Sequence, residues 1–339
     1  MFTIEAKYST YSATAIYIHT YSNNNNIMYK KRAGKPNAHL DAIYSVDWTP
    51  YGDIVTGSLD ETVRIWNHNH TSGDDDSGGH GKDTLVEKKC FEGHELGVIS
   101  AQVHRDGKIL AASSLDSQIR FYDMETGTLK QSLDAGPIES WSISFHPTEH
   151  YLATGGFEGK VNIWDCEKGV IKNALAVDSG TFALSVQYAP SGNKLAVSCQ
   201  NGTVAIFDMS DKESGKMLQK YDDLKKSVRC VEYDNEGSLL FAACDDCNIN
   251  MYDPRKAKPV ATLTSHTAWV LSVASSPDGK HFASSSTDKT VKIWDIGMRK
   301  YVHSFENHSD QVWDISYASD GRHLVSVGED SGLNLYECI

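Results

Sequence analysis

Several features that mark whole classes of protein are missing from this sequence. Its 339 residues contain no run of the roughly 18–20 apolar residues that a membrane-spanning helix needs, so we expect no contact with a membrane. The N-terminus lacks a basic segment followed by an apolar stretch, which argues against a secretory signal. The seven cysteines are an odd number at scattered spacings, which favours reduced thiols in the nucleus or cytoplasm over a disulfide framework.

Positive charge is also scarce. The chain has 32 Lys and Arg against 45 Asp and Glu, which gives a net charge of −13. A protein that binds nucleic acid generally needs a basic surplus to displace counterions from the phosphates. We therefore expect no direct contact with nucleic acid.

A short pattern recurs seven times: an alternating apolar run that ends in an aromatic residue, usually followed by an acid. The seven aromatics are Trp66, Tyr122, Trp164, Phe207, Tyr252, Trp294 and Tyr336. Successive copies lie 56, 42, 43, 45, 42 and 42 residues apart. Six residues before each aromatic stands a residue that can accept hydrogen bonds in a tight turn. These residues are Asp60, Asp116, Glu158, Asn201, Asp246, Asp288 and Asp330. Such a period predicts one supersecondary unit per copy rather than two or three separate domains.

A unit of 42–45 residues with alternating apolar strands, Gly/Asp turns and a terminal Trp-Asp resembles the WD40 repeat. The resemblance implies an all-β, seven-bladed propeller over residues 27–339. In the sixth copy the four expected strands are PVATL, VLSVAS, HFASSS and TVKIW. The last copy ends at Tyr336, so its blade lacks an outer strand. In WD-repeat proteins the N-terminal segment supplies that strand, and the candidate here is residues 27–32 (IMYKKR).

The resemblance extends to a Trp-His-Ser-Asp hydrogen-bond network. The matching sets are His39–Ser58–Asp60–Trp66, His266–Ser286–Asp288–Trp294 and, with Tyr for Trp, His94–Ser114–Asp116–Tyr122. In the other blades Gly156, Cys199, Cys244 and Gly328 replace the Ser. Ser, His and Asp together also suggest a hydrolase, but a catalytic nucleophile occurs once and lies in a cleft. Because this set repeats at a fixed spacing, we interpret it as a buried structural network without a catalytic role.

Two segments depart from the repeat. Residues 67–83 form an acidic, Gly-rich insert, which we expect to be a solvated loop. Residues 1–26 are polar and aromatic without periodicity, and we expect a disordered N-terminal extension.

Two sets of metal-ligand residue types occur in the chain. The insert contributes His68, His70, His80 and the acids at 74–76. A flexible loop does not preorganise ligands, so we expect neither a metal nor another cofactor there. Cys244 and Cys247 have the spacing of half a zinc site, but no second pair completes it, and the repeat places them in a turn of the fifth blade.

Propellers without catalytic activity bind partners through their faces. The narrower top face is built by the loops that enter the innermost strands and by the turns that carry the repeated acids. Alignment of the seven copies brings to this mouth Tyr44, Leu59, Leu115, Trp141, Phe157, Phe182, Arg229, Trp269 and Trp313. An aromatic-rich patch is unusual on a surface that meets only water, and Trp, Tyr and Arg dominate interface hot spots. We predict that this face binds a partner; the alternative is that some rings pack under neighbouring loops.

The predicted ligand of the top face is a peptide segment. Glu139, Asp245 and Glu329 border the apolar centre, with Arg229 as an exception. A peptide with an apolar anchor over the rings and a basic residue toward these acids would match the face.

Longer stretches resemble the small WD-repeat subunits of superkiller complexes. These stretches include TGSLDETVRIW, DAGPIESWSISFHP and HTAWVLSVASSPDGKHFASSSTDKTVKIWDIGMRKYVHSF, and the resemblance spans roughly residues 36–339. It implies a non-catalytic scaffold that joins a helicase and a tetratricopeptide-repeat protein in exosome-mediated 3′-to-5′ mRNA decay. It also implies membership of the nuclear RNA-polymerase-II-associated elongation complex, which is linked to histone methylation. The large helical-repeat partner would dock on the propeller top at Tyr44, Trp141, Phe182, Trp269 and Trp313.

Two other functions compete with this one. Substrate receptors of cullin-type ubiquitin ligases often carry Trp-Asp-x-Arg after the third strand, and only Tyr252-Asp253-Pro254-Arg255 approximates that motif here. A hydrolase would need carboxylates or a metal in the central channel, where we expect no repeated His or acid cluster.

Overall fold

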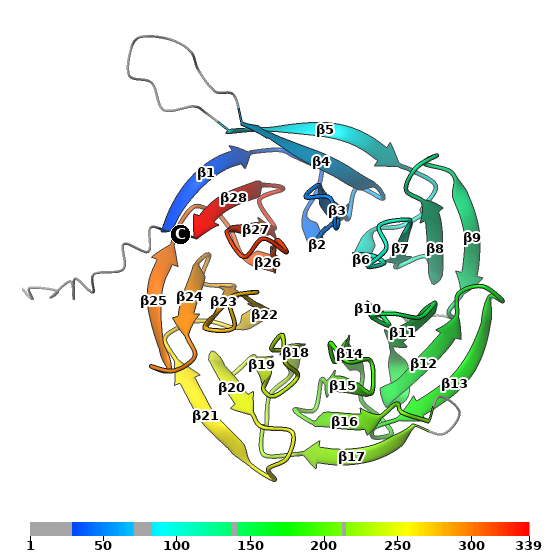
Figure 1. Cartoon of the computed structure of the whole chain (residues 1–339), viewed down its shortest axis with the longest axis vertical. Helices are drawn as coiled ribbons and strands as arrows, with labels where there is room; N and C mark the ends of the chain where they lie inside the picture. Colours follow the sequence, from blue (N-terminus) through cyan, green and yellow to red (C-terminus); the bar gives the residue numbers. More distant parts are fainter. Residues whose placement is uncertain (1–28, 71–82, 137–140, 212–214, 339) are drawn as a thin grey trace, which may run out of the picture.

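The chain forms a closed ring of antiparallel sheets. The computed structural model describes residues 29–70, 83–136, 141–211 and 215–338, so the predicted extension 1–26 lies outside the described residues. Seven four-stranded sheets stand as blades around a central axis (Figure 1), which confirms the seven-bladed, all-β propeller. Among the described residues there is no helix long and apolar enough to cross a membrane.

Each blade contains an innermost, a second, a third and an outer strand. The innermost strands are β2 (Ile43–Trp48), β6 (Val98–Val103), β10 (Ser142–Phe145), β14 (Ala183–Tyr188), β18 (Val228–Tyr233), β22 (Val270–Ser275) and β26 (Val312–Tyr317). The second strands are β3 (Ile54–Ser58), β7 (Ile109–Ser114), β11 (Tyr151–Gly155), β15 (Lys194–Cys199), β19 (Leu240–Cys244), β23 (His281–Ser286) and β27 (His323–Gly328). The third strands are β4 (Val63–His70), β8 (Gln118–Asp123), β12 (Lys160–Asp165), β16 (Val204–Asp208), β20 (Asn248–Tyr252), β24 (Val291–Asp295) and β28 (Leu333–Cys338). The outer strands are β5 (Asp83–Phe91), β9 (Leu129–Asp134), β13 (Val170–Ala176), β17 (Lys216–Tyr221), β21 (Pro259–Thr264), β25 (Lys300–Phe305) and β1 (Tyr29–Lys35). In the described part of the chain, one 3-10 turn, η1, covers Phe157–Gly159.

The ring closes as the sequence predicts, through the N-terminal strand. β1 pairs antiparallel with β28, with Tyr29 opposite Cys338 and Lys35 opposite Leu333, and so completes blade 7. The predicted strand, 27–32, ends too early: the pairing continues through Lys35 beyond a bulge between Lys31 and Ala33, while residues 27 and 28 lie outside the described residues. Each blade sheet presents two apolar faces, and the buried clusters lie between neighbouring blades, so closure is needed to cover the faces of blades 1 and 7.

The insert is shorter than the sequence predicts. β4 continues to His70 and β5 begins at Asp83, with His70 paired to Asp83, so residues 67–70 and Asp83 belong to a hairpin rather than to a loop. This hairpin packs beside the closing strand: the Arg32 guanidinium of β1 lies 2.8 Å from the Asp83 carboxylate and 3.1 Å from Glu337. Blade 1 is therefore joined to blade 7 by an ion pair that the repeat itself does not supply.

The predicted Trp-His-Ser-Asp network is present in blade 1, but its hydroxyl does not come from Ser58, the residue that the sequence analysis assigned. His39 Nδ1 lies 2.9 Å from the Asp60 carboxylate, and His39 Nε2 lies 2.7 Å from Oγ1 of Thr56. The Trp66 indole donates to the same Thr56 oxygen at 2.9 Å. Ser58 instead donates to the carbonyl of Ala42 and accepts from the Asp60 amide, so it shapes the turn. The alternation of strand β3 explains the error, because Thr56 and Ser58 point to the same side of the sheet.

The same correction applies to the other blades. In blade 6 the shared hydroxyl is Ser284, which bonds His266 at 2.7 Å and Trp294 at 2.8 Å, and not Ser286. Blade 7, which the sequence treats as a departure, has a network of its own in which Ser326 bonds His308 at 2.6 Å and Tyr336 at 3.0 Å.

Blade 2 carries the incomplete network. Ala112 occupies the register of Thr56, and His94 Nε2 is buried without a hydrogen-bond partner among the described residues. Ser114 donates to the Leu96 carbonyl instead. Burial and the nearby Arg120 guanidinium lower the pKa of His94 to about 4. Its imidazole is therefore neutral near pH 7.

Substitution of Ser284 tests the corrected assignment. We expect Ser284→Ala to lower the free energy of unfolding by about 2 kcal/mol, because it leaves two buried ring nitrogens, on His266 and Trp294, without the hydroxyl. Ser286→Ala, the matched control, should cost about 1 kcal/mol or less. Denaturant unfolding followed by tryptophan fluorescence measures both; equal losses would show that Ser284 has no special place in the network.

Candidate partner-binding face

The turns between second and third strands explain how the top-face side chains are presented. In blade 1 the Thr62 amide donates to the Asp60 carboxylate at 3.1 Å, and Glu61 between them has a left-handed φ of 70°. The same side-chain-to-backbone turn recurs at Asp116, where Ser117 has φ 68°. This turn directs the residue before each acid, such as Leu59 or Leu115, toward the mouth.

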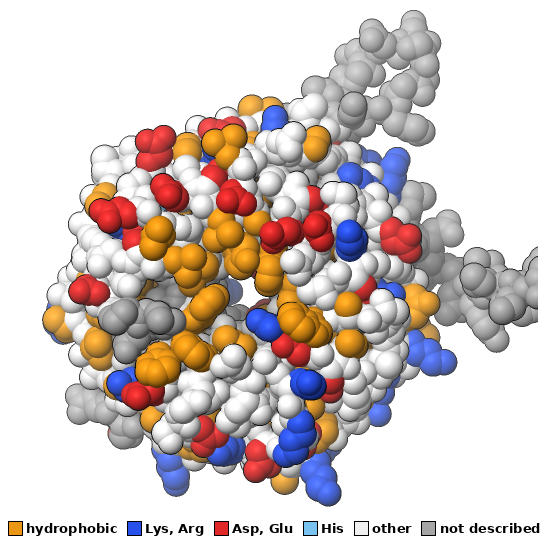
Figure 2. Space-filling view, turned by 180° about the vertical axis from the view of Figure 1, so that it is seen from behind, with side chains coloured by type: hydrophobic (Ala, Val, Ile, Leu, Met, Phe, Trp, Pro, Cys, Tyr) orange, Lys and Arg blue, Asp and Glu red, His pale blue; other side chains and the backbone are white. Residues whose placement is uncertain are grey.

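Apolar side chains gather around the central opening on this face (Figure 2). Trp269 is 50% exposed, Leu115 47%, Phe157 42% and Trp141 38%. The other predicted members are partly buried: Tyr44, Leu59, Phe182, Arg229 and Trp313. The structure thus brings the nine predicted residues to one end of the blades, where some rings face water and others pack against neighbours. Binding of a partner there stays a prediction.

Three contacts join members of the face across blade boundaries. Tyr44 and Trp313 stack with ring centroids 4.3 Å apart, which connects blades 1 and 7. Phe157 and Phe182 lie 5.2 Å apart and connect blades 3 and 4. Arg229 lies 5.2 Å over the Trp269 ring and connects blades 5 and 6. These rings are held in place before any partner arrives, which reduces the entropy lost on binding.

The charged rim is less available than the sequence suggests. Arg229 donates to both oxygens of Asp245, at 2.8 and 2.9 Å, and the Trp313 indole donates to Glu329 at 2.6 Å. Burial, together with the Glu329 and Asp41 charges, raises the pKa of Tyr44 above its ordinary value, so the phenol stays protonated. Glu139 lies outside the described residues. A basic group on a ligand would therefore have to share Asp245 and Glu329 with their present donors.

Two exposed leucines extend the face beyond the predicted set. Leu40 is 91% exposed and Leu96 is 50% exposed, and both lie in the loops that lead to the innermost strands of blades 1 and 2. Each follows the repeated His by one or two residues, at a position the alignment did not include. Their spacing from that His is the sequence signal that could have identified them.

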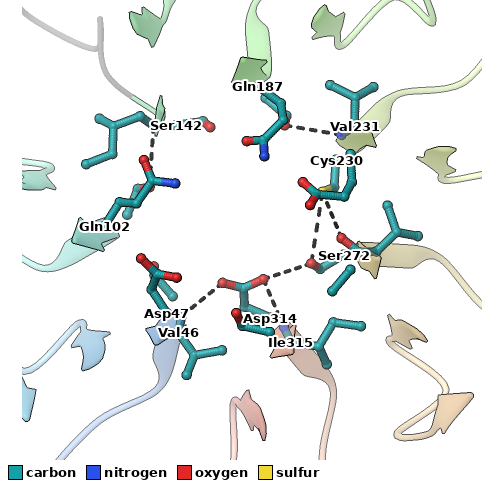
Figure 3. A pocket seen from close by; sticks show the side chains of 18 of the residues that line it. Val46, Asp47, Gln102, Ser142, Gln187, Cys230, Val231, Ser272, Asp314 and Ile315 are labelled. Atoms are coloured by element: carbon teal, nitrogen blue, oxygen red, sulfur yellow. Dashed lines mark hydrogen bonds between the residues drawn. The ribbon is translucent and has the colours of Figure 1, made fainter. Parts of the chain in front are cut away.

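The central channel is where the sequence prediction is wrong. Three carboxyl groups, Asp47, Glu232 and Asp314, line a cavity of about 220 Å³ between the innermost strands, together with Gln102 and Gln187 (Figure 3). Asp47 and Glu232 share one register of their innermost strands, which Gln102 and Gln187 occupy in blades 2 and 4, while Asp314 lies two residues earlier in its strand. The acids therefore do not recur in every copy of the repeat. Burial raises the pKa of Asp47 to about 7, of Glu232 to about 8 and of Asp314 to about 6.

Most polar groups in the channel bond the backbone of a neighbouring blade. Asp47 accepts from the Val103 amide at 2.9 Å, and Asp314 accepts from the Val46 amide at 2.9 Å. Gln102 accepts from the Phe145 amide at 2.6 Å. The innermost strands are sheet edges with unpaired amides, and these side chains satisfy them. The channel groups therefore hold neighbouring blades in register, which is a structural role.

The ligase motif and the Cys pair are engaged within the chain. Arg255 makes two hydrogen bonds to the Asp253 carboxylate, at 2.8 and 2.9 Å. Both cysteines are free thiols; Cys244 ends β19, whereas Cys247 lies in the following turn as predicted, and burial raises the pKa of both. Neither feature adds a site.

Comparison with known proteins gives consistent matches. The family model described as "WD domain, G-beta repeat" matches residues 31–67, 85–123, 127–165, 257–295 and 299–337, and the model of the anaphase-promoting complex subunit 4 WD40 domain matches 178–234. WD repeat-containing protein SL1-17 of Schistosoma mansoni is 34% identical over 241 residues, which cover 69% of this chain and 73% of that protein. WD repeat-containing protein VIP3 of Arabidopsis thaliana is 32% identical over 262 residues, which cover 72% of this chain and 76% of that protein.

Proposed function

Because this chain belongs to the WD40-repeat family, we propose that it is a non-catalytic interaction subunit whose top face binds a segment of a larger partner protein. The observation that carries the proposal is the gathering of apolar side chains around the mouth (Figure 2), to which the exposed rings of Trp141, Phe157 and Trp269 contribute. A preformed aromatic surface of this kind suits hot-spot binding. The fold by itself is compatible with many partners, so the partner is argued from the motifs.

The proposed partners are those of a superkiller-type complex. The support is the resemblance of the long motifs, such as DAGPIESWSISFHP in the third repeat, to the small subunits of those complexes. The chain would link a tetratricopeptide-repeat protein and a helicase in exosome-mediated 3′-to-5′ mRNA decay. It would also join the RNA-polymerase-II-associated elongation complex, and so act in both nucleus and cytoplasm. The net charge of −13 supports leaving nucleic-acid contacts to the partners.

A double substitution on the top face tests this function. Trp141 and Trp269 are the tryptophans of the face with the largest exposure, so Trp141→Ala with Trp269→Ala should leave the fold intact. We expect partner affinity to fall by about 2 kcal/mol for each residue, or roughly a thousandfold together, because hot-spot rings dominate such interfaces. The partner is first identified by affinity purification of the tagged chain from cytosolic and nuclear fractions, and its affinity is then measured directly.

The control removes an exposed aromatic from the opposite end of the blades. Tyr51 is 76% exposed in the turn between β2 and β3, and Tyr51→Ala should not change the affinity. A folded double variant with wild-type affinity would contradict the proposed face. Recovery of a ligase adaptor in place of the helicase would favour the ubiquitin-ligase alternative.

A further inference from the structure

Two histidines meet where the first and last blades join. His68 lies in β4 of blade 1, and His323 begins β27 of blade 7, yet their ring centroids are 5.2 Å apart with the planes tilted by 49°. The Trp48 ring lies against both and excludes water from one side. The sequence analysis places His68 in a solvated loop, but in the structure β4, which carries His68, pairs with β5. The imidazole is therefore held by the fold.

The hydrogen bonds of the two rings leave one nitrogen of each ring free. His323 Nδ1 lies 2.6 Å from the Asp320 carboxylate, and its Nε2 bonds none of the described residues. His68 Nδ1 is shielded from solvent and has no hydrogen-bond partner in the described structure. Nδ1 of His68 and Nε2 of His323 are thus the two ring nitrogens that remain to offer a lone pair to a ligand.

The spacing and the surroundings suit a metal ion. With Zn–N bonds of about 2.0–2.1 Å, the centres of two imidazoles on one tetrahedral ion stand about 5 Å apart. The carboxylate behind His323 is the outer-shell partner that orients ligating histidines in metal sites. Burial and the neighbouring His323 lower the pKa of His68, which favours an unprotonated ring able to bind a metal, and the nearby Asp83 and Asp320 carboxylates attract a cation. A second histidine pair, His104 and His150, has the same 5.2 Å separation, but its rings are stacked at 22°, so it cannot point both rings at one ion.

We propose that His68 and His323 bind a divalent transition metal, Zn²⁺ by preference, which fastens the blade 1 hairpin to blade 7. Imidazole nitrogen is a preferred ligand of Zn²⁺ and Cu²⁺. The described residues include no group of three or more His, Cys, Asp or Glu able to hold a metal, so water completes the coordination. The ion would reinforce the closure that β1 and Arg32 already make. This site is independent of the top face.

Titration of the metal-free full-length chain with ZnCl₂, by calorimetry and by thermal unfolding, tests the proposal. We expect one ion to bind and to raise the unfolding temperature. His68→Ala and His323→Ala should each weaken binding by more than about tenfold, and Asp320→Asn by about tenfold through loss of ring orientation. If an alanine variant fails to fold, His68→Gln and His323→Gln keep the volume of the side chain and answer the same question.

The matched control is His281, which pairs with Asp278 at 2.6 Å as His323 pairs with Asp320. None of the histidines in the described ranges stacks on His281, so His281→Ala should bind Zn²⁺ like the wild type. Zinc binding that survives both His68→Ala and His323→Ala would overturn the proposal, whichever histidines then held the ion. Absence of binding by the wild type would overturn it as well.

Discussion

A chain that begins at Pro36, and so lacks β1, is expected to lose about 5 kcal/mol of unfolding free energy or more. Six residue pairs join β1 to β28, and each lost backbone hydrogen bond costs about 1 kcal/mol net. The deletion also uncovers the edge beside Leu333 and Leu335, which are buried in the cluster between blades 1 and 7. Because whole domains are stable by only about 5–15 kcal/mol, the ring is expected to open or aggregate.

The control for this deletion is a chain that lacks residues 1–26 alone. It keeps β1 and Arg32, and we expect its urea unfolding midpoint to match the full chain. Should the two truncations prove equally stable, β1 would not be the closing element. A lower urea unfolding midpoint for the chain without residues 1–26 would show that this extension stabilises the fold, against the prediction from its composition.

Glu232→Gln is expected to stabilise the protein by about 2 kcal/mol near pH 8.5. Burial in the channel raises the pKa of Glu232 to about 8, so ionisation opposes folding, and glutamine removes the charge without changing the shape. The expected stabilisation is smaller than the pKa shift alone would give, because water in the open channel screens the charge. Gln102 and Gln187 already occupy this register in blades 2 and 4, which shows that the channel accepts the amide.

The pH dependence follows from the direction of the three channel shifts. A carboxyl whose pKa is higher in the folded than in the unfolded chain stabilises the fold at low pH, and that contribution is lost as the pH rises toward the folded pKa. With folded pKa values of about 8 for Glu232 and about 7 for Asp47, the wild type should lose about 1–2 kcal/mol between roughly pH 6.5 and pH 8.5. Below about pH 6.5 the buried His39 and His94 act in the opposite direction, because burial lowers their pKa.

Thermal unfolding of the two proteins across this range is the measurement. The Glu232→Gln profile should be flatter than the wild-type profile, and the two should converge toward low pH. Glu125→Gln, at an exposed glutamate in the turn before β9, is the matched control and should leave the profile unchanged. Parallel profiles for wild type and Glu232→Gln would mean that the channel carboxyl ionises freely in the folded protein.

The candidate face shows which features the repeat pattern can predict and which it cannot. Alignment of the repeats placed Trp141, Phe157 and Trp269 at the mouth correctly, because each position is defined by its own blade. It could not tell that Arg229 is neutralised by Asp245 or that Trp313 stacks on Tyr44, since those contacts depend on side-chain conformations across blade boundaries. The hydroxyl of the buried network was misplaced by two residues for a related reason: Thr56 and Ser58 share a face of β3, and only the packed distances distinguish them.

The sequence by itself determined the number of blades, the N-terminal closure and the residues of the mouth, because a repeated hydrophobic period and its turns are local properties of the chain. Only the tertiary structure decided which hydroxyl joins the network, that three carboxyls meet in the channel and that His68 faces His323. Those features arise between segments as much as 268 residues apart, as in the hydrogen bond that the Val46 amide donates to the Asp314 carboxylate. Their physics depends on desolvation and distance, which exist only once the ring has closed.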